Sequence, residues 1–341
     1  MTATDPIVPA PVPAPAAPAD PVAATRVRLT PNLFGTSFGL TGLAAAWTAA
    51  AAATDLPTWP ATALWVAAAL AHVVIAVAYL ADALAHHRLA SDVADPVLGP
   101  FTALGFVPVM LLGAWVFGYQ RTFGQVVVAV GVVGTVLLGA HLTGGWISSP
   151  GPLQRWHPGY FLPSVAGGLI AAQSLAKVGW HEAGLVAFGY GAISWLVLGS
   201  ILLVRLMTQP ALPAPLLPTM AIEVAPPVVA SNAWFALNGG RSDLVVVLLA
   251  GYGVFMALVQ LRLVPLYLRS SFGPGFWSFS FSYAALATTA VTWLHLTAPA
   301  GATGWIVAVL VVLTLGYAAL IARTALALTR GRYFARVPLP S

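Results

Sequence analysis

The stretch GFWSFSFSYAALATT, residues 275–289, sets small and hydroxyl-bearing side chains beside bulky rings. Residues three and four apart share one face of an α-helix, so one face of this stretch carries Ser278, Ser282, Ala285 and Thr289. Phe281 lies at the edge of that stripe. The pattern is typical of a helix that lines a narrow conduit, where an uncharged ring closes the path by excluding water. Close helix packing in a membrane also favours small residues, so both interpretations stay open at this point.

Outward from this stretch, the whole chain is apolar. Its 341 residues are 59% hydrophobic and only 7% charged, with a mean hydropathy of +0.89, whereas about a quarter of the residues in a soluble domain are charged. The apolar runs are long and lack the alternation of a membrane barrel. The composition therefore predicts an all-α integral membrane protein that lies in a lipid bilayer.

The composition also excludes several kinds of site. The chain has no cysteine, which excludes disulfides and thiolate metal sites. The net charge of +5 comes from basic residues scattered over short loops, where they orient a membrane protein, so no nucleic-acid partner is implied. No phosphate-binding loop, nucleophile elbow or metal-spaced cluster appears. We expect no cofactor, no metal and no enzymatic activity.

The apolar part of the chain divides into ten segments. A hydrocarbon core about 30 Å thick needs roughly 20 apolar residues for each crossing. Short loops join the segments in pairs, which predicts five helical hairpins. The ten predicted segments are residues 33–54, 58–86, 98–118, 122–147, 159–179, 182–207, 215–237, 242–268, 274–297 and 302–328.

The two ends of the chain differ from this domain of residues 31–330. Residues 1–30 are rich in Pro and Ala, a composition that cannot bury a core, so we predict a disordered tail. Residues 331–341 are predicted to form a second, short tail. With the N-terminus inside, three of the 14 Lys and Arg residues fall outside, namely Arg121, Lys177 and Arg241. This positive-inside bias predicts a cell-membrane protein with both termini in the cytoplasm.

The ten segments alternate in amino-acid composition. The even ones are aliphatic and β-branched, like lipid-facing helices, whereas the odd ones collect Gly, Ser, Thr and Pro. Irregular backbone is tolerated at membrane depth only where protein or a water-filled cavity covers it, so the odd segments are predicted to form an inner ring. Prolines inside them interrupt the backbone hydrogen bonds of the helix. Such breaks occur at transporter binding sites and also as tolerated kinks, and both interpretations stay open. The further pore-lining candidates are Gly35, Gly39, Pro108, Pro163, Gly168, Glu223, Pro226 and Pro227.

Five motifs occur in order along the chain. They are FGxxxGL at 34–40, HPGYFLPSVA at 157–166, PTMAIEVAP at 218–226, LRLVP at 261–265 and FWSFSF at 276–281. No single motif is specific, but together they resemble the tellurite-resistance and dicarboxylate transporter family. That family includes the bacterial TehA proteins and the plant guard-cell slow-type anion channels. The resemblance runs from about residue 31 to residue 330.

The resemblance implies five hairpins in a quasi-fivefold arrangement around a central pore, commonly assembled as a homotrimer. It also implies an anion channel or uniporter for small anions of the chloride, nitrate, tellurite, sulfite or dicarboxylate class. A Phe of the ninth helix blocks the pore in this family, and its motif position matches Phe281. The next residue, Ser282, is Pro in the plant channels and Gly in TehA, so we expect a softer kink here.

Glu223 is the acidic residue predicted inside a pore-lining segment, where a carboxylate costs a few kcal/mol and suggests a function. If ionised in the pore, it would repel anions; if protonated, it can donate a hydrogen bond or couple transport to protons. A neutral structural Glu facing another helix is the third interpretation. The alternative to a channel is thus a proton-coupled carrier that exports tellurite, sulfite or dicarboxylate, with Glu223 as the coupling group. A haem enzyme is a distant third, because His72 and His86 lack a matching pair on a second helix.

Overall fold

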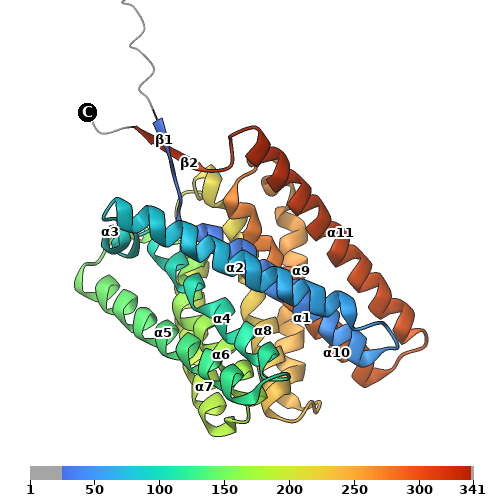
Figure 1. Cartoon of the computed structure of the whole chain (residues 1–341). Coiled ribbons are helices and arrows are strands. Elements are labelled where there is room, and N and C mark those ends of the chain that lie inside the picture. Colours follow the sequence, from blue (N-terminus) through green and yellow to red (C-terminus); the bar gives the residue numbers. More distant parts are fainter. Residues whose placement is uncertain (1–24, 339–341) are drawn as a thin grey trace, which may run out of the picture.

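The computed structural model of the chain describes residues 25–338, which are almost entirely helical (Figure 1). The disorder predicted for residues 1–24 lies outside the described residues. Each of the ten predicted segments is helical, and its ends lie within two residues of the predicted ends. The agreement has a simple cause, because unpaired backbone groups are costly in hydrocarbon and a long apolar run must therefore be one helix.

Five of the segments are single long helices with little burial. Only 22% to 28% of the residues in their most apolar windows are buried, as expected for helices that face lipid. The five helices are α2 (Trp59–Ala85), α5 (Arg121–Ser148), α7 (His181–Thr208), α9 (Leu244–Leu268) and α11 (Ala302–Thr329).

The other five segments begin with irregular turns and lie deeper. In the segment Ala214–Leu237, 78% of the most apolar window is buried. The α-helices of these segments are α1 (Phe34–Ala53), α4 (Val107–Val116), α6 (Gly167–Lys177), α8 (Ala225–Leu237) and α10 (Ser278–Thr297). The preceding turns are η1 (Pro31–Leu33), η2 (Gly99–Gly105), η4 (Pro158–Tyr160), η5 (Leu162–Ala166), η6 (Ala214–Val224) and η7 (Pro274–Trp277), while α3 (Leu89–Ala94) and η3 (Leu153–Arg155) lie in connections.

Prolines mark three points where the helix type changes, as the sequence predicts. Pro108 lies in the first turn of α4, and Pro226 and Pro227 lie in the first turn of α8. Proline is tolerated there because its missing N–H has no partner in a first turn. Pro163 lies in η5, a single turn of π-helix. Each proline thus lies where an irregular turn passes into an α-helix.

The helices contact one another in a closed pattern. Sequence neighbours pair as α1 with α2, α4 with α5, α6 with α7, α8 with α9 and α10 with α11. The deeper helices also form a circuit of contacts from α1 to α4, α6, α8, α10 and back to α1. Glycines permit close approach between helices; a Cβ on Gly168 of α6 would lie 2.5 Å from the Gly191 Cα of α7.

Seven of the described helical stretches are long and apolar enough to cross a membrane. They are α2, α5, α7, α9 and α11 together with Gly99–Val116 and Ala214–Leu237. The other three predicted segments contain α1, α6 and α10, which are richer in Gly, Ser, Thr and Gln. An integral, all-α, multi-pass protein accounts for these helices.

The two ends of the described chain pair with each other in a small sheet, drawn at the top of Figure 1. Strand β1 (Thr25–Arg28) runs antiparallel to β2 (Ala335–Pro338), and we call this sheet the terminal clasp. The sequence predicts tails at residues 1–30 and 331–341, and within them residues 25–28 and 335–338 form the clasp.

Ion pairs explain why these short strands are held. Arg28 of β1 pairs at 2.6 Å with the fully buried Asp92 of α3, and Arg26 lies 3.8 Å from Asp82 of α2. Arg88 pairs with both carboxylates. Partly buried pairs of this kind lose less to solvent screening than exposed ones, so they fix β1 to the corner between α2 and α3.

Candidate functional site

The stripe of α10 faces the middle of the circuit of deeper helices. Ser278, Phe281 and Ser282 line one cavity there, and Phe281 and Ala285 line a second. These positions are spaced by three and four residues, as one face of an α-helix requires. The predicted pattern of small side chains around one ring is therefore the face of α10 that meets open space.

The first cavity lies at the end of the helices next to the terminal clasp, and we call it the near cavity. Its volume is about 50 Å³, room for only a few water molecules. Asn32, just after β1, lies in its wall together with Gly35, Phe38 and Phe161. Apart from Asn32 and two serines, its walls are carbon-rich and uncharged.

The second cavity lies toward the opposite ends of the same helices, and we call it the far cavity. Its volume is about 300 Å³. Polar groups are more frequent in its wall, which includes Gln173, Lys177 and Asn232. Phe281 and Val229 line both cavities, so these two side chains stand at the boundary between them.

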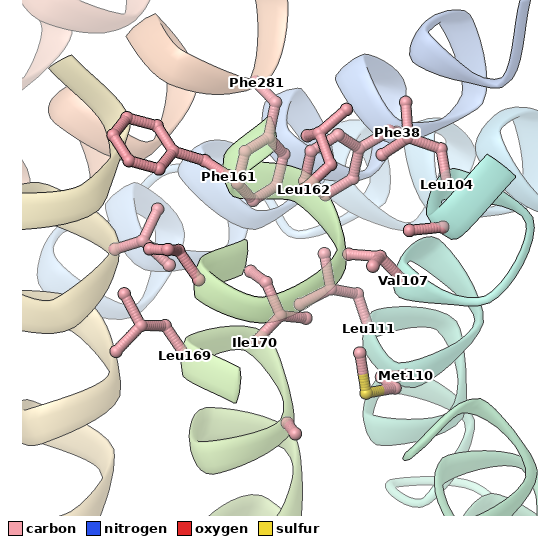
Figure 2. Close-up of a cluster of buried hydrophobic side chains, with 14 of the residues drawn as sticks. Phe38, Leu104, Val107, Met110, Leu111, Phe161, Leu162, Leu169, Ile170 and Phe281 are labelled. Atoms are coloured by element: carbon pink, nitrogen blue, oxygen red, sulfur yellow. The ribbon is translucent and has the colours of Figure 1, made fainter. Parts of the chain in front are cut away.

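A stacked pair of rings forms the boundary. The Phe281 ring lies nearly parallel to that of Phe38 of α1, with centroids 3.7 Å apart and planes 15° apart. Figure 2 shows both rings at one level with Phe161, among aliphatic side chains that include Leu111 and Leu169. Only 9% of Phe281 is exposed. The rings and aliphatic side chains of this cluster cannot replace the hydration of an ion.

A glycine of α1 makes room for the ring. A Cβ on Gly42 would lie 3.0 Å from Cδ2 of Phe281 and 2.9 Å from Cβ of Ala284. Both separations are shorter than ordinary contacts between carbon atoms. The absence of a side chain at Gly42 therefore lets α10 and its ring approach α1.

Hydrogen bonds hold α10 against α8 in the turns that follow the ring. The Asn232 amide of α8 donates to the Ala285 carbonyl at 3.2 Å, and Thr289 donates to the Asn232 side chain at 2.9 Å. The α-helix continues unbroken through Ser282, whose hydroxyl donates to the Ser278 carbonyl. This continuity agrees with the softer kink expected from the sequence.

Charge is almost absent from the two cavities. Among the described residues that line them, there is no Asp or Glu, and Lys177 of α6 is the single ionisable cation. An anion in either cavity would therefore meet no fixed negative charge. The positive charge lies in the far cavity.

The sequence-predicted candidates divide into two groups. Gly35, Pro226, Ser278, Phe281, Ser282 and Ala285 line the cavities, whereas Gly39, Pro108, Pro163, Gly168, Glu223 and Pro227 are not among the lining residues. Two of the latter serve helix packing instead. Gly168 meets Gly191 of α7, and a Cβ on Gly39 would lie 2.1 Å from Oγ of Ser280.

Glu223 is not among the residues that line either cavity, so its predicted place in the pore wall stays a prediction. The lining row of this segment consists of Ile222, Ala225, Pro226 and Val229, spaced by three and four residues. Glu223 and Pro227 are each one residue later and fall on the adjacent face. Glu223 is buried there, in η6, which contacts α9. One carboxyl oxygen, Oε1, is buried without a hydrogen-bond partner.

Sequence reasoning missed several lining residues. Phe38 stands three residues after Gly35 and thus on the same helix face, inside the FGxxxGL motif, so its position could have been found by spacing. Val229 lies seven residues after Ile222 on one face for the same reason. Lys177 and Asn232 left no such signal, because the sequence shows only their place near helix ends and not which cavity they border.

Known proteins are similar to this chain in sequence. A family model described as voltage-dependent anion channel (SLAC1) matches residues 28–325. The chain belongs to this family. The match extends from the end of β1 to α11 and includes both cavities and the stacked rings.

Individual relatives in the SLAC1 family are a bacterial protein and plant channels. The tellurite resistance protein TehA homolog of Haemophilus influenzae is 29% identical over 275 residues, which cover 78% of this chain and 82% of that protein. The S-type anion channel SLAH1 of Arabidopsis thaliana is 32% identical over 130 residues, which cover 38% of this chain and 34% of that channel. The similarity identifies a multi-pass membrane protein of an anion-channel family and not an enzyme.

Proposed function

We propose that the protein is an anion channel or uniporter, with a path that runs through the near cavity, past Phe281 and into the far cavity. One observation carries this proposal: Phe281 lines both cavities while its ring stacks on Phe38. A ring at such a boundary blocks an ion by excluding water. Displacement of the ring would join the cavities into one path.

The proposed pore lies on the axis of the deeper helices. We infer ten membrane crossings in five hairpins, in a quasi-fivefold arrangement, from the closed circuit of contacts between α1, α4, α6, α8 and α10. The distribution of basic residues supports a cell-membrane location with cytoplasmic termini. The near cavity would then open toward the cytoplasm and the far cavity toward the outside. The family resemblance supports a homotrimer.

Selectivity for small anions follows from what lines the path. No acidic side chain borders the cavities among the described residues, and hydroxyl and amide groups of Asn32, Ser278 and Asn232 can solvate an anion. Chloride and nitrate are the simplest candidates, and tellurite, sulfite or a dicarboxylate belongs to the same class. The near cavity of about 50 Å³ is too small for a hydrated anion, which supports a closed gate.

The direct test is Phe281→Ala in the full-length protein, reconstituted in planar bilayers. Removing the ring should raise chloride conductance by at least about tenfold, which corresponds to a barrier lower by about 1.4 kcal/mol. The matched control is Phe279→Ala, on the same helix, because Phe279 points into the groove between α10 and α11 and not into either cavity. Its conductance should stay at the wild-type value.

Two results would overturn the gate. The first is an unchanged chloride conductance in a Phe281→Ala protein that still unfolds cooperatively. The second is an equal rise in Phe279→Ala, which would trace the effect to a general loosening of α10. If Phe281→Ala raised potassium conductance as much as chloride conductance, the anion selectivity would be contradicted. The role of Phe281 as a gate would still stand.

A proton-coupled carrier is the second candidate, and the buried Glu223 with its unpartnered Oε1 favours it. In a carrier, proton binding at Glu223 would be coupled to movement of the anion. Uptake into liposomes driven by a pH gradient should then vanish in Glu223→Gln, which keeps the size but cannot ionise. An ohmic current that ignores the pH gradient would identify the channel instead.

A further inference from the structure

The far cavity contains a lysine whose role the gate does not explain. Lys177 is the last residue of α6, and its side chain is exposed although it lies in the wall of the cavity. No carboxylate pairs with it among the described residues. An unpaired ammonium group that borders a protein cavity attracts anions into it.

A free hydroxyl group lies one turn away. Four hydroxyl-bearing residues line the far cavity, and in three of them the hydroxyl donates to a carbonyl of its own helix: Thr48 to Ala44, Thr288 to Ala284 and Thr292 to Thr288. The fourth, Ser174, is fully buried, and its Oγ has no hydrogen-bond partner. A buried hydroxyl without a partner costs free energy, so a ligand in the cavity would satisfy it.

Ser174 and Lys177 belong to the same face of α6, because they are three residues apart on the helix. Gln173, which also lines the cavity, adds an amide donor beside them. The three side chains thus offer an ammonium, a hydroxyl and an amide, all of which donate hydrogen bonds. The set suits a small anion, whereas the ammonium charge repels a cation.

We propose that Lys177, Ser174 and Gln173 form an anion-binding subsite in the far cavity, which concentrates a small hydrated anion on one side of Phe281. This inference rests on the proposed function, since it assigns the subsite to the same path. The cavity volume of about 300 Å³ leaves room for several water molecules. An anion therefore binds here with part of its hydration shell and loses more of it only at the rings.

A purely structural role is the competing explanation. A lysine in the last turn of a helix stabilises the negative end of the helix dipole, and Lys177 has that place in α6. Such a role predicts a change in stability without any dependence of conductance on the anion concentration. The experiment therefore has to vary the anion on the far side alone.

The test uses single-channel recordings of the full chain with Phe281→Ala, in which the ring no longer limits the current. At about 10 mM chloride on the far side, adding Lys177→Gln should reduce conductance on the order of tenfold, the scale of charge-focused concentration in a cleft. The loss should fade at 1 M salt, where the Debye length is about 3 Å. Lys177→Arg should keep most of the conductance, whereas Ser174→Ala should lower it less than Lys177→Gln but at both concentrations.

The matched control is Arg121→Gln in the same background. Arg121 is an exposed cation at the start of α5, predicted on the same side of the membrane, and it lines neither cavity. If Lys177→Gln conducts at 10 mM like Arg121→Gln, the subsite does not exist. Should Lys177→Gln fail to fold, Ser174→Ala decides, because an unchanged conductance there would also overturn the subsite.

A binding measurement separates this inference from the proposed function. Replacing gluconate by bromide at constant ionic strength should raise the melting temperature of the wild-type protein in detergent, and Lys177→Gln should lose that rise. If Phe281→Ala conducts no anions but the bromide effect depends on Lys177, the channel proposal fails and the subsite stands. If Phe281→Ala conducts but neither measurement depends on Lys177, the channel stands and the subsite fails.

Discussion

The near and far cavities share two wall residues but differ in size and chemistry. The near cavity measures about 50 Å³ and is lined mainly by rings and aliphatic groups. The far cavity is about 300 Å³ and contains hydroxyl and amide groups together with Lys177. Both are bounded by Phe281, so the difference arises from the ends of the helices and not from the ring itself.

The difference separates two tasks along one path. Water-filled space with polar groups can hold an ion near its hydrated state, whereas a tight apolar passage cannot, and its energy barrier sets the rate. The far cavity therefore favours collecting anions, and the near cavity with its stacked rings favours stopping them. Each task should respond to substitutions in its own cavity and not to substitutions outside both.

The largest effect after Phe281→Ala is expected for Phe38→Ala. Phe38 borders only the near cavity and stacks on Phe281, and stacked aromatic pairs contribute about 0.5–1.5 kcal/mol. Losing this contact should free the Phe281 ring and raise chloride conductance by up to about tenfold. Bilayer recordings would measure the rise, which should be smaller than that of Phe281→Ala.

The double variant sharpens this prediction. If the two rings act as one gate, Phe38→Ala should add little conductance once Phe281→Ala is present, because the stacked partner is already gone. Independent, multiplying increases would mean that each ring blocks the path by itself. That result would move the boundary from a pair of rings to two separate constrictions.

An intermediate effect, on stability, is expected for Gly42→Ala. The added methyl would meet Phe281 and Ala284 at about 3 Å, and such overpacking typically costs about 1–3 kcal/mol. Thermal unfolding in detergent should therefore show a lower melting temperature for Gly42→Ala. In the Phe281→Ala background the loss should be smaller, since one of the two clashing groups is absent. Equal losses in both backgrounds would place the ring elsewhere than against Gly42.

The smallest effect is expected for Glu223→Gln. Glu223 lies on the face toward α9 and lines neither cavity, so in a channel its charge state should change conductance by less than about twofold, or about 0.4 kcal/mol. The measurement is chloride conductance of wild type and variant between pH 5 and pH 9. Two profiles that diverge with pH would return the carboxyl to the conducting path and favour the carrier.

The helices themselves could be predicted from the sequence because hydrophobicity and length decide them. All ten segments end where the apolar runs end, and the inner set was recognisable from its Gly, Ser and Pro content. The face of α10 was predictable as well, since Ser278, Phe281 and Ser282 combine small side chains with one ring. The clasp was not predictable, because its short strands depend on ion pairs with Asp82 and Asp92, far along the chain.

The positions of small residues do not show which face of each of the other inner helices lines a cavity. A small side chain is compatible with a cavity wall and also with a close contact between helices. Gly39 and Gly168 lie at such close contacts. In the segment around Glu223, one residue separates the lining face from the packed face, an angle of about 120° on the 3-10 helix η6. Sequence spacing alone leaves that angle undetermined, since the hydrophobic pattern there is nearly the same on every side.

The terminal clasp also bears on the number of membrane crossings. Strands β1 and β2 are hydrogen-bonded to each other, so the chain enters its first membrane segment and leaves its last on the same side. A path that returns to its starting side crosses the membrane an even number of times. Seven helices satisfy length and apolarity, and seven is odd. Crossing by all seven would therefore require at least one of the polar segments that contain α1, α6 and α10 to cross as well, sheltered by its neighbours from lipid.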